Sequence, residues 1–240
     1  MLNYRSQTKE IQKVVQTGLL VAIALVIRSF SYMIYIGGAP AIRISFSGPF
    51  SKLPGILFGP LYGGITGGLM DVLGYLLKPE GGYIPWFTVT SISGGVLTAF
   101  LWRWVQNISK QQLQRILLLG FIGVAILGIA NRVMNISKFE LLWIPIIGFG
   151  FLAMDLYLSK KWKKNQGQIY FLKLLIAIGI SGLLVTTINT YFLKLFIPAL
   201  SKKGFLALWI PRLMEELVII PIQAYIMTLL LHIYEKFLVK

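Results

Sequence analysis

The sequence contains no cysteine and only one histidine among its 240 residues. The lack of cysteine excludes a disulfide framework, a thiolate metal site and a cysteine nucleophile. Acidic side chains are also scarce, with 8 Asp and Glu against 23 Lys and Arg. The sequence has no GxxxxGK[ST] loop, so this chain cannot handle ATP by that motif. We therefore expect no metal, no cofactor and no enzymatic activity, and a function based on binding.

Apolar residues dominate what remains. They make up 56% of the chain, charged residues make up 13%, and the mean hydropathy is +0.75. A soluble core of this size could not bury so many apolar side chains, so the composition predicts an integral membrane protein that crosses the bilayer several times. The basic residues lie in short loops between apolar runs, where they favour topology and lipid headgroup contact over nucleic-acid binding.

The order of the apolar runs predicts an all-α protein of about eight membrane-embedded helices in one domain, 1–240. Runs of about 20 apolar residues are long enough to cross a hydrocarbon layer of roughly 30 Å. We expect helices over about 14–36, 88–105, 116–134, 141–158, 170–196 and 206–234, with a shorter apolar stretch at 49–77. A basic loop at 103–115 and a second at 160–164 separate some of them.

The stretch Pro49–Leu77 is either one kinked helix or two short helices, because Gly59-Pro60 interrupts it. Arg28, Lys173 and Arg212 fall within spans and are left out of the count. Of the other Lys and Arg residues, two short helices that return to the same side place twelve with the N-terminus and eight opposite, whereas a single span gives nine against eleven. By the positive-inside rule the larger group is cytoplasmic. The charge pattern therefore favours two short helices, with both termini and the 160–164 loop in the cytoplasm.

Two overlapping GxxxG pairs, Gly63/Gly67 and Gly64/Gly68, predict close packing of the second short helix against a neighbour. Asp71 follows on the same helix. A carboxylate within a membrane segment is by default a functional candidate. The alternative is that Asp71 is a hydrogen-bond acceptor that fixes the packing of its helix.

The loop Lys78–Phe87 is rich in proline, glycine and aromatic residues, which favours a lid over a planar ligand. The alternative is an interfacial aromatic belt. In the first helix, Gly18 and Ala22 form a small-xxx-small pair that suits either docking of a partner helix or internal packing. Arg28 lies within the same apolar run, so it needs a partner or a wet cavity.

Several segments resemble the substrate-binding S components of energy-coupling factor (ECF) vitamin transporters, above all the folate-specific ones. They are RISF at 43–46, LPGILFGPLYGGITGGLMDVLGYLLKP at 53–79, GGYIPWFTVTSISGG at 81–95, NTYFL at 189–193 and PRLMEELVIIPIQ at 211–223. The resemblance implies a six-helix membrane bundle that binds a vitamin from outside and docks on a transmembrane coupling subunit driven by two ATPases. It also implies the plasma membrane of a prokaryote.

The resemblance places the ligand loops at Gly37–Gly48 and Lys78–Phe87. Aromatic rings there would stack on a planar ligand, hydroxyl and amide groups would orient it, and Arg43 is the preferred cation for an acidic tail. The expected substrate-binding residues are Arg43, Ser45, Phe46, Tyr83, Pro85, Trp86, Phe87, Thr88, Thr90, Asn189 and Arg212. Gly18 and Ala22 are the expected docking surface for the coupling subunit.

The sequence departs from the family pattern in two places. Residues 106–168 have no counterpart in the six-helix pattern, so we expect about two added helices at 116–158, beside a core formed by 14–105 and 170–236. Glu215-Glu216 also brings acidic groups close to Arg212. Because Glu216 can pair with Arg212 four residues earlier, Arg212 is the weaker candidate for an anionic ligand. The departures leave the identity of the vitamin open.

Two other functions compete with vitamin binding. The glutamate pair 215–216 suggests an intramembrane hydrolase, but such sites need a base or metal constellation, and the single histidine, His232, lies four turns away. A self-sufficient secondary transporter would also use Asp71, Arg28 and a broken helix at Gly59-Pro60. The absence of a clear inverted repeat argues against it.

Overall fold

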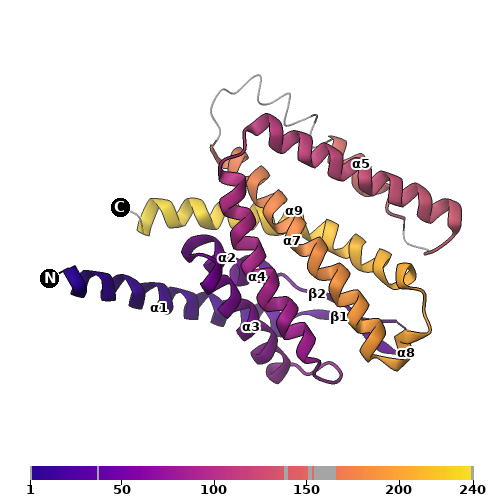
Figure 1. The fold of residues 1–240 in the computed structure, drawn as a ribbon, viewed down its shortest axis with the longest axis horizontal. Helices are drawn as coiled ribbons and strands as arrows, with labels where there is room; N and C mark the ends of the chain where they lie inside the picture. The colour runs from indigo at the N-terminus through magenta and orange to yellow at the C-terminus, as the bar shows by residue number, and fades with distance from the viewer. Residues whose placement is uncertain (1, 37, 138–139, 151–152, 154–165, 239–240) are drawn as a thin grey trace. The chain divides into compact units, whose positions relative to one another are not determined.

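The structure of the chain is a computed structural model that describes residues 2–36, 38–137, 140–150, 153 and 166–238. It divides the chain into two compact units, residues 1–103 and 104–240. Figure 1 shows the ribbon with the elements labelled. Each unit is described by itself.

The first helix of the first unit is shorter at its C-terminal end than the sequence predicts. Helix α1 covers Leu2–Ser29 and is followed by strand β1, Tyr32–Ile36. The prediction of one helical span over 14–36 is therefore wrong at its end. The run YMIYI is aromatic and β-branched, which suits a strand, and Gly38 has the positive φ of +81° that a tight reversal needs.

Strand β2, Ala39–Ile44, pairs antiparallel with β1. Half of the expected loop Gly37–Gly48 is thus the second strand of a β-hairpin. The pairing is irregular between Ile34 and Tyr35, where Tyr35 lies opposite Pro40. Proline has no N–H to give to the ladder, which accounts for the irregularity at this position. These two strands are the only ones among the described residues, and all the other elements there are helices. The predicted all-α fold class is therefore confirmed, with one small hairpin in addition.

Residues 49–77 form two helices, α2 over Gly48–Phe58 and α3 over Pro60–Leu77. Gly59 between them has φ +106°, a conformation that favours glycine, and Pro60 is the first residue of α3, where proline is tolerated. The prediction of two short helices is confirmed. Helix α1 packs against both, with Val21, Ala24 and Met70 at the centre of the contact.

Helix α4, Pro85–Gln106, packs against α3 with backbone in contact with backbone. A Cβ placed on Gly63 would overlap the carbonyl of Gly95, and a Cβ on Gly67 would overlap the carbonyl of Ser91. The close helix packing expected from the GxxxG pairs is confirmed. Helix α4 begins at Pro85, three residues before the predicted start, because proline fits the first turn of a helix.

The second unit is helical. Helix α5, Lys110–Met134, starts with a capping box in which Ser109 and Gln112 exchange hydrogen bonds. Most of the predicted loop 103–115 is therefore helix, with only 107–109 between α4 and α5. Residues 143–150 are also helical. The rest of the predicted helix 141–158 lies largely outside the described residues, and the basic loop 160–164 lies wholly outside them.

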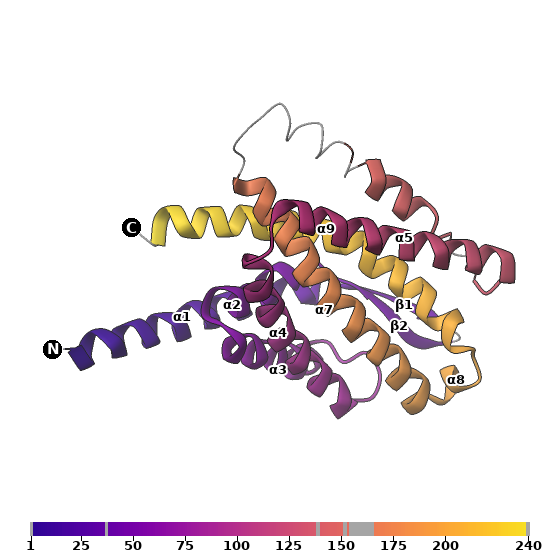
Figure 2. The ribbon, with the colours of Figure 1, turned by 45° about the horizontal axis from the view of Figure 1, so that its top comes forward.

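Helices α7, Gln166–Phe196, and α9, Phe205–Leu238, form the core of the second unit, and the short helix α8, Pro198–Ser201, connects them. Figure 2 shows α7 and α9 side by side. Buried Leu174 and Ile178 of α7 and Leu213 and Met227 of α9 contribute to the apolar core.

Four of the described helices are long and apolar enough to cross a membrane by length and composition: α1 from Lys9, α5, α7 from Gly167, and α9 up to Lys236. Their most apolar windows leave between half and more than four-fifths of their residues unburied in the structure, as expected for helices that face lipid. The protein is a multi-pass membrane protein.

Candidate functional site

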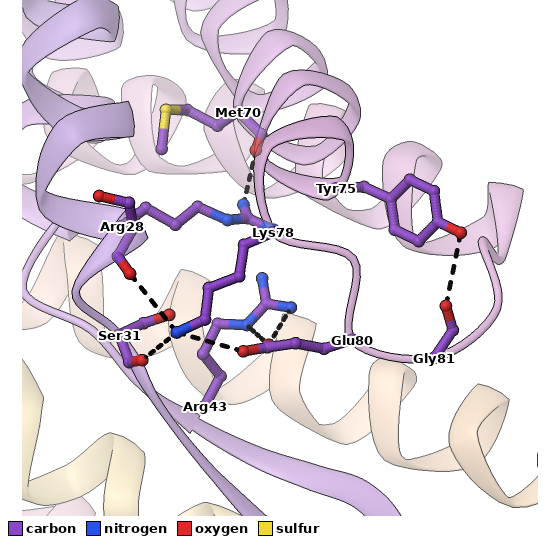
Figure 3. Close-up of polar contacts among 9 residues, drawn as sticks. Arg28, Ser31, Arg43, Met70, Tyr75, Lys78, Glu80 and Gly81 are labelled. Atoms are coloured by element: carbon purple, nitrogen blue, oxygen red, sulfur yellow. Dashed lines mark hydrogen bonds and ion pairs between the residues drawn. The ribbon is translucent and has the colours of Figure 1, made fainter.

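Charged side chains of the first unit gather where α1 ends, β2 passes and the loop after α3 begins. Figure 3 shows the group. The Nζ of Lys78 donates to the backbone oxygen of Ser31 at 2.5 Å and to that of Ser29 at 3.4 Å. It also lies 3.4 Å from Oε1 of Glu80. These three contacts use the three donors of an ammonium group. Lys78 therefore ties the loop after α3 to the end of α1.

Glu80 also binds Arg43 of β2. Its Oε2 lies 2.8 Å from Nη2 of Arg43 and accepts from Nε at 3.1 Å. The carboxylate is nearly buried, with 7% of its side chain exposed, whereas 29% of the Arg43 side chain is exposed. Two of the five N–H groups of Arg43 face Glu80, and the others have no acceptor among the described residues. Glu80 therefore orients Arg43, which still has N–H groups for a ligand.

Arg28 completes the charged group and was not among the expected binding residues. Its Nη1 donates to the carbonyl of Met70 at 2.6 Å, and its guanidinium packs on Gly74, where any larger residue would overlap it. The buried Nε of Arg28 has no hydrogen-bond partner in the described part of the chain. Arg28 lies in the last turn of α1, and its charge interacts with those of Arg43, Asp71 and Glu80.

Taken together, this group has three cations, Arg28, Arg43 and Lys78, and two carboxylates, Asp71 and Glu80. One positive charge is left over. A single anionic group on a ligand would balance it, and an arginine with free N–H groups is well suited to bind a carboxylate.

A chain of hydrogen bonds connects the loop to α3. Thr88 donates from Oγ1 to Oδ2 of Asp71 at 2.7 Å. The hydroxyl of Tyr83 lies 2.5 Å from the same Oγ1. Asp71 thus has the structural hydrogen bond that one interpretation of the sequence predicted, and only one of its oxygens is used in it.

The other expected binding residues of this unit differ in exposure. Phe46, Tyr83 and Trp86 expose 50%, 42% and 48% of their surface. Pro85 is also exposed, and Phe87 is partly buried. Thr90 is buried, and its hydroxyl donates to the carbonyl of Phe87. Ser45 shares a hydrogen bond with Ser47. The aromatic rings are therefore more accessible than Thr90.

In the second unit, the expected residues lie near a polar group on α7 and α9. Glu216 accepts from Thr186 at 3.3 Å and packs on Gly182, and Trp209 donates from Nε1 to Thr187 at 2.9 Å. Arg212, on α9, is attracted by Glu215 and Glu216. Asn189 lies on α7, partly exposed, within one turn of Thr186 and Thr187.

Comparison with known proteins assigns the chain to a family. The family model "ECF transporter, substrate-specific component" matches residues 12–157, more than half of the chain. The chain belongs to the ECF transporter substrate-specific components. The match runs through most of the predicted added helices 116–158, whose place in or beside the family core stays a prediction.

The relative found for this substrate-specific component is the folate transporter FolT of Clostridium novyi (strain NT). The two sequences are 43% identical over 58 residues, which is 24% of this chain and 34% of the relative. The alignment thus spans about a third of the relative's length. No solved structure matches the chain at a significant level.

The expected docking surface of the substrate-specific component lies on α1. Gly18 and Ala22 are exposed, and no described atom lies within 4 Å of a Cβ placed on Gly18. Leu19 and Val26 beside them are exposed by 62% each. This face is open in the structure, so its role as a docking surface stays a prediction that the packing does not oppose.

Sequence reasoning did not include Arg28, Lys78 and Glu80 among the binding residues. Arg28 had a signal, since an arginine in an apolar run needs a partner. Lys78 and Glu80 flank Pro79 in the expected lid, and nothing in the local sequence marks either of them as a partner of Arg43. Only the approach of the hairpin makes Glu80 a partner of Arg43.

Proposed function

We propose that this protein is the vitamin-binding subunit of an ECF-type importer, and that its substrate is folate or a related vitamin with a planar head and an acidic tail. The family match carries the proposal, and the similarity to a folate transporter supports the substrate class. In this proposal the chain itself catalyses no reaction. A transmembrane coupling subunit and two ATPase subunits supply the energy, and the protein lies in a prokaryotic plasma membrane with both termini in the cytoplasm.

The charged group of the first unit supports an acidic substrate. Arg43 offers N–H groups that Glu80 does not use, and the surplus of one positive charge favours an anion over a neutral solute. The exposed rings of Phe46, Tyr83 and Trp86 are surfaces on which a planar head could stack. The contributions of Asn189 and Arg212 to the same substrate belong to the proposal.

A binding screen of the purified full chain tests this function. We expect folate to bind, other classes of vitamin such as thiamin and riboflavin to bind at least tenfold more weakly, and the folate signal to fall with Arg43→Gln. Preference for another class of vitamin would keep the family role and refute the folate assignment. The absence of binding by any vitamin, with the protein folded, would refute the vitamin-binding role.

A self-sufficient secondary transporter is the second candidate, because Asp71 and Arg28 are charged groups on the apolar helices α3 and α1. The two functions differ in what the lone chain does. In liposomes that contain only this protein, we expect substrate to bind without being concentrated. Accumulation driven by an ion gradient would establish the secondary transporter instead.

A further inference from the structure

The hydrogen bonds between α3 and α4 have a fixed direction. An aspartate carboxylate only accepts, so Thr88 must donate its hydroxyl hydrogen to Oδ2 of Asp71. A threonine hydroxyl has one hydrogen. The bond of 2.5 Å between Thr88 and Tyr83 must therefore be donated by Tyr83. Asp71 sets the direction of the whole chain.

With the hydrogen bonds in this direction, the two terminal residues, Tyr83 and Asp71, each have an oxygen that can accept a further hydrogen bond, and neither has a hydrogen left to donate. The single hydroxyl hydrogen of Tyr83 is used on Thr88, so its oxygen has only lone pairs to offer. Oδ1 of Asp71 receives no hydrogen bond from the described residues. Asp71 is partly exposed, and 42% of Tyr83 is exposed. Both oxygens can therefore accept hydrogen bonds from the N–H groups of a ligand.

Asp71 does not lie on the strongly exposed apolar stripe of α3. That stripe is formed by Leu61, Ile65, Leu69, Val72 and Leu76, all exposed. At 100° per residue, Asp71 lies on the flank that also carries Gly64, and Gly64 faces Ile92 and Val96 of α4. A carboxylate oxygen that is shielded from water on an apolar helix is costly unless it finds a donor. Asp71 lacks one for Oδ1 in the described part of the chain, and a ligand can provide it.

We propose that Asp71 and Tyr83 select the substrate by accepting hydrogen bonds from an N–H edge of its planar head. The inference rests on the proposed function. The 2-amino-4-oxopteridine head of folate, pterin, carries an amino group next to a ring N–H, which are two adjacent donors. Lumazine, the 2,4-dioxopteridine, has the same shape and replaces the amino group by an oxygen. The acceptor-only site should therefore bind pterin and reject lumazine.

The test is the ratio of the affinities for pterin and lumazine, measured on the purified full chain. We expect the unaltered protein to prefer pterin by roughly ten- to a hundredfold, the loss for a charge-assisted hydrogen bond. Asp71→Asn should bring the ratio close to one, because the amide can accept from Thr88 and turn its NH2 group outward. Tyr83→Phe should lower the ratio by a smaller factor, about two- to tenfold.

Tyr75→Phe is the matched control. The ring of Tyr75 lies 5.1 Å from that of Tyr83, but its hydroxyl donates to the carbonyl of Gly81 and makes no hydrogen bond to Tyr83, Thr88 or Asp71. This variant should leave the ratio unchanged. Because each value is a ratio of two ligands on one sample, a loss of folded protein does not alter it.

Equal affinities for pterin and lumazine in the unaltered protein would overturn the inference, as would a ratio that Asp71→Asn leaves unchanged. If Asp71→Asn does not fold, an unchanged ratio in Tyr83→Phe overturns it instead. Folate binding is measured on the same sample to separate the two proposals. Folate binding without a preference for pterin refutes the inference alone, whereas no binding of folate or either pteridine refutes the proposed function and the inference with it.

Discussion

The close contact of α3 and α4 at Gly67 gives a prediction that links packing to ligand binding. A Cβ at Gly67 would overlap the carbonyl oxygen of Ser91, with its carbonyl carbon 2.7 Å away and the Cα of Ile92 at 3.2 Å. These are backbone atoms, so no side chain can turn aside. Gly67→Ala must push the two helices apart. Asp71 and Thr88 meet one turn further along the same contact, so their 2.7 Å bond should lengthen.

The expected size follows from the packing. Inserting a methyl group into a filled contact costs typically 1–3 kcal/mol. The gain from replacing a helical glycine by alanine is at most about 1 kcal/mol. Gly123 in α5 is the matched control, because no described atom lies within 4 Å of a Cβ placed there. Gly123→Ala should therefore keep the propensity gain without the overlap. The two variants should differ by roughly 1–3 kcal/mol in stability.

Thermal unfolding of the purified protein in one detergent measures this difference. For a chain of this length it corresponds to about 2–4 °C in Tm per kcal/mol. Folate affinity, measured well below Tm, should fall for Gly67→Ala and stay unchanged for Gly123→Ala. If Gly67→Ala melts at or above the temperature of Gly123→Ala, the helices are not in backbone contact at this position. If it melts lower but binds folate normally, the packing does not position Asp71 and Thr88 for the ligand.

Three further predictions concern charge, docking and topology. Arg43→Gln should weaken folate roughly ten- to a hundredfold and leave the affinity for uncharged pterin nearly unchanged; equal losses would mean that Arg43 shapes its loop and does not read charge. Gly18→Leu with Ala22→Leu should abolish uptake by cells and spare binding by purified protein, whereas loss of both would indicate internal packing. A cysteine at Gly82 should react with an impermeant thiol reagent on intact cells, and one at Gly167 should not; the reverse pattern refutes the topology.

The sequence predicted the helices well because their signals are local. Apolar runs and the Gly59-Pro60 break need no knowledge of the rest of the chain to predict α2, α3, α5, α7 and α9. The GxxxG pairs predicted close packing because glycines on one helix face let the backbone of a neighbouring helix approach closely. The family resemblance came from short motifs of this region and from two more at 189–193 and 211–223.

The hairpin was missed because its apolar strands continued the apolar run of α1. Residues 32–36 are hydrophobic enough for a membrane helix, and the two glycines that follow are typical of the start of a loop. The β-branched and aromatic residues on one side of a Gly-Gly pair, with a second apolar run beyond it, were the available signal. Hydrophobicity alone does not distinguish a strand from the end of a helix.

The sequence by itself determined that this protein lies in a membrane, where most of its helices run and to which family it belongs, since these depend on composition and short motifs. Only the tertiary structure decided which charges meet. Glu80 reaches Arg43 across 37 residues, and Thr88 reaches Asp71 across 17. Such bonds depend on how the hairpin, α3 and α4 approach one another. Local sequence does not show that approach. The approach makes Arg43 one half of an ion pair, and it makes Asp71 the residue that fixes the direction of the hydrogen bonds from Tyr83 and Thr88.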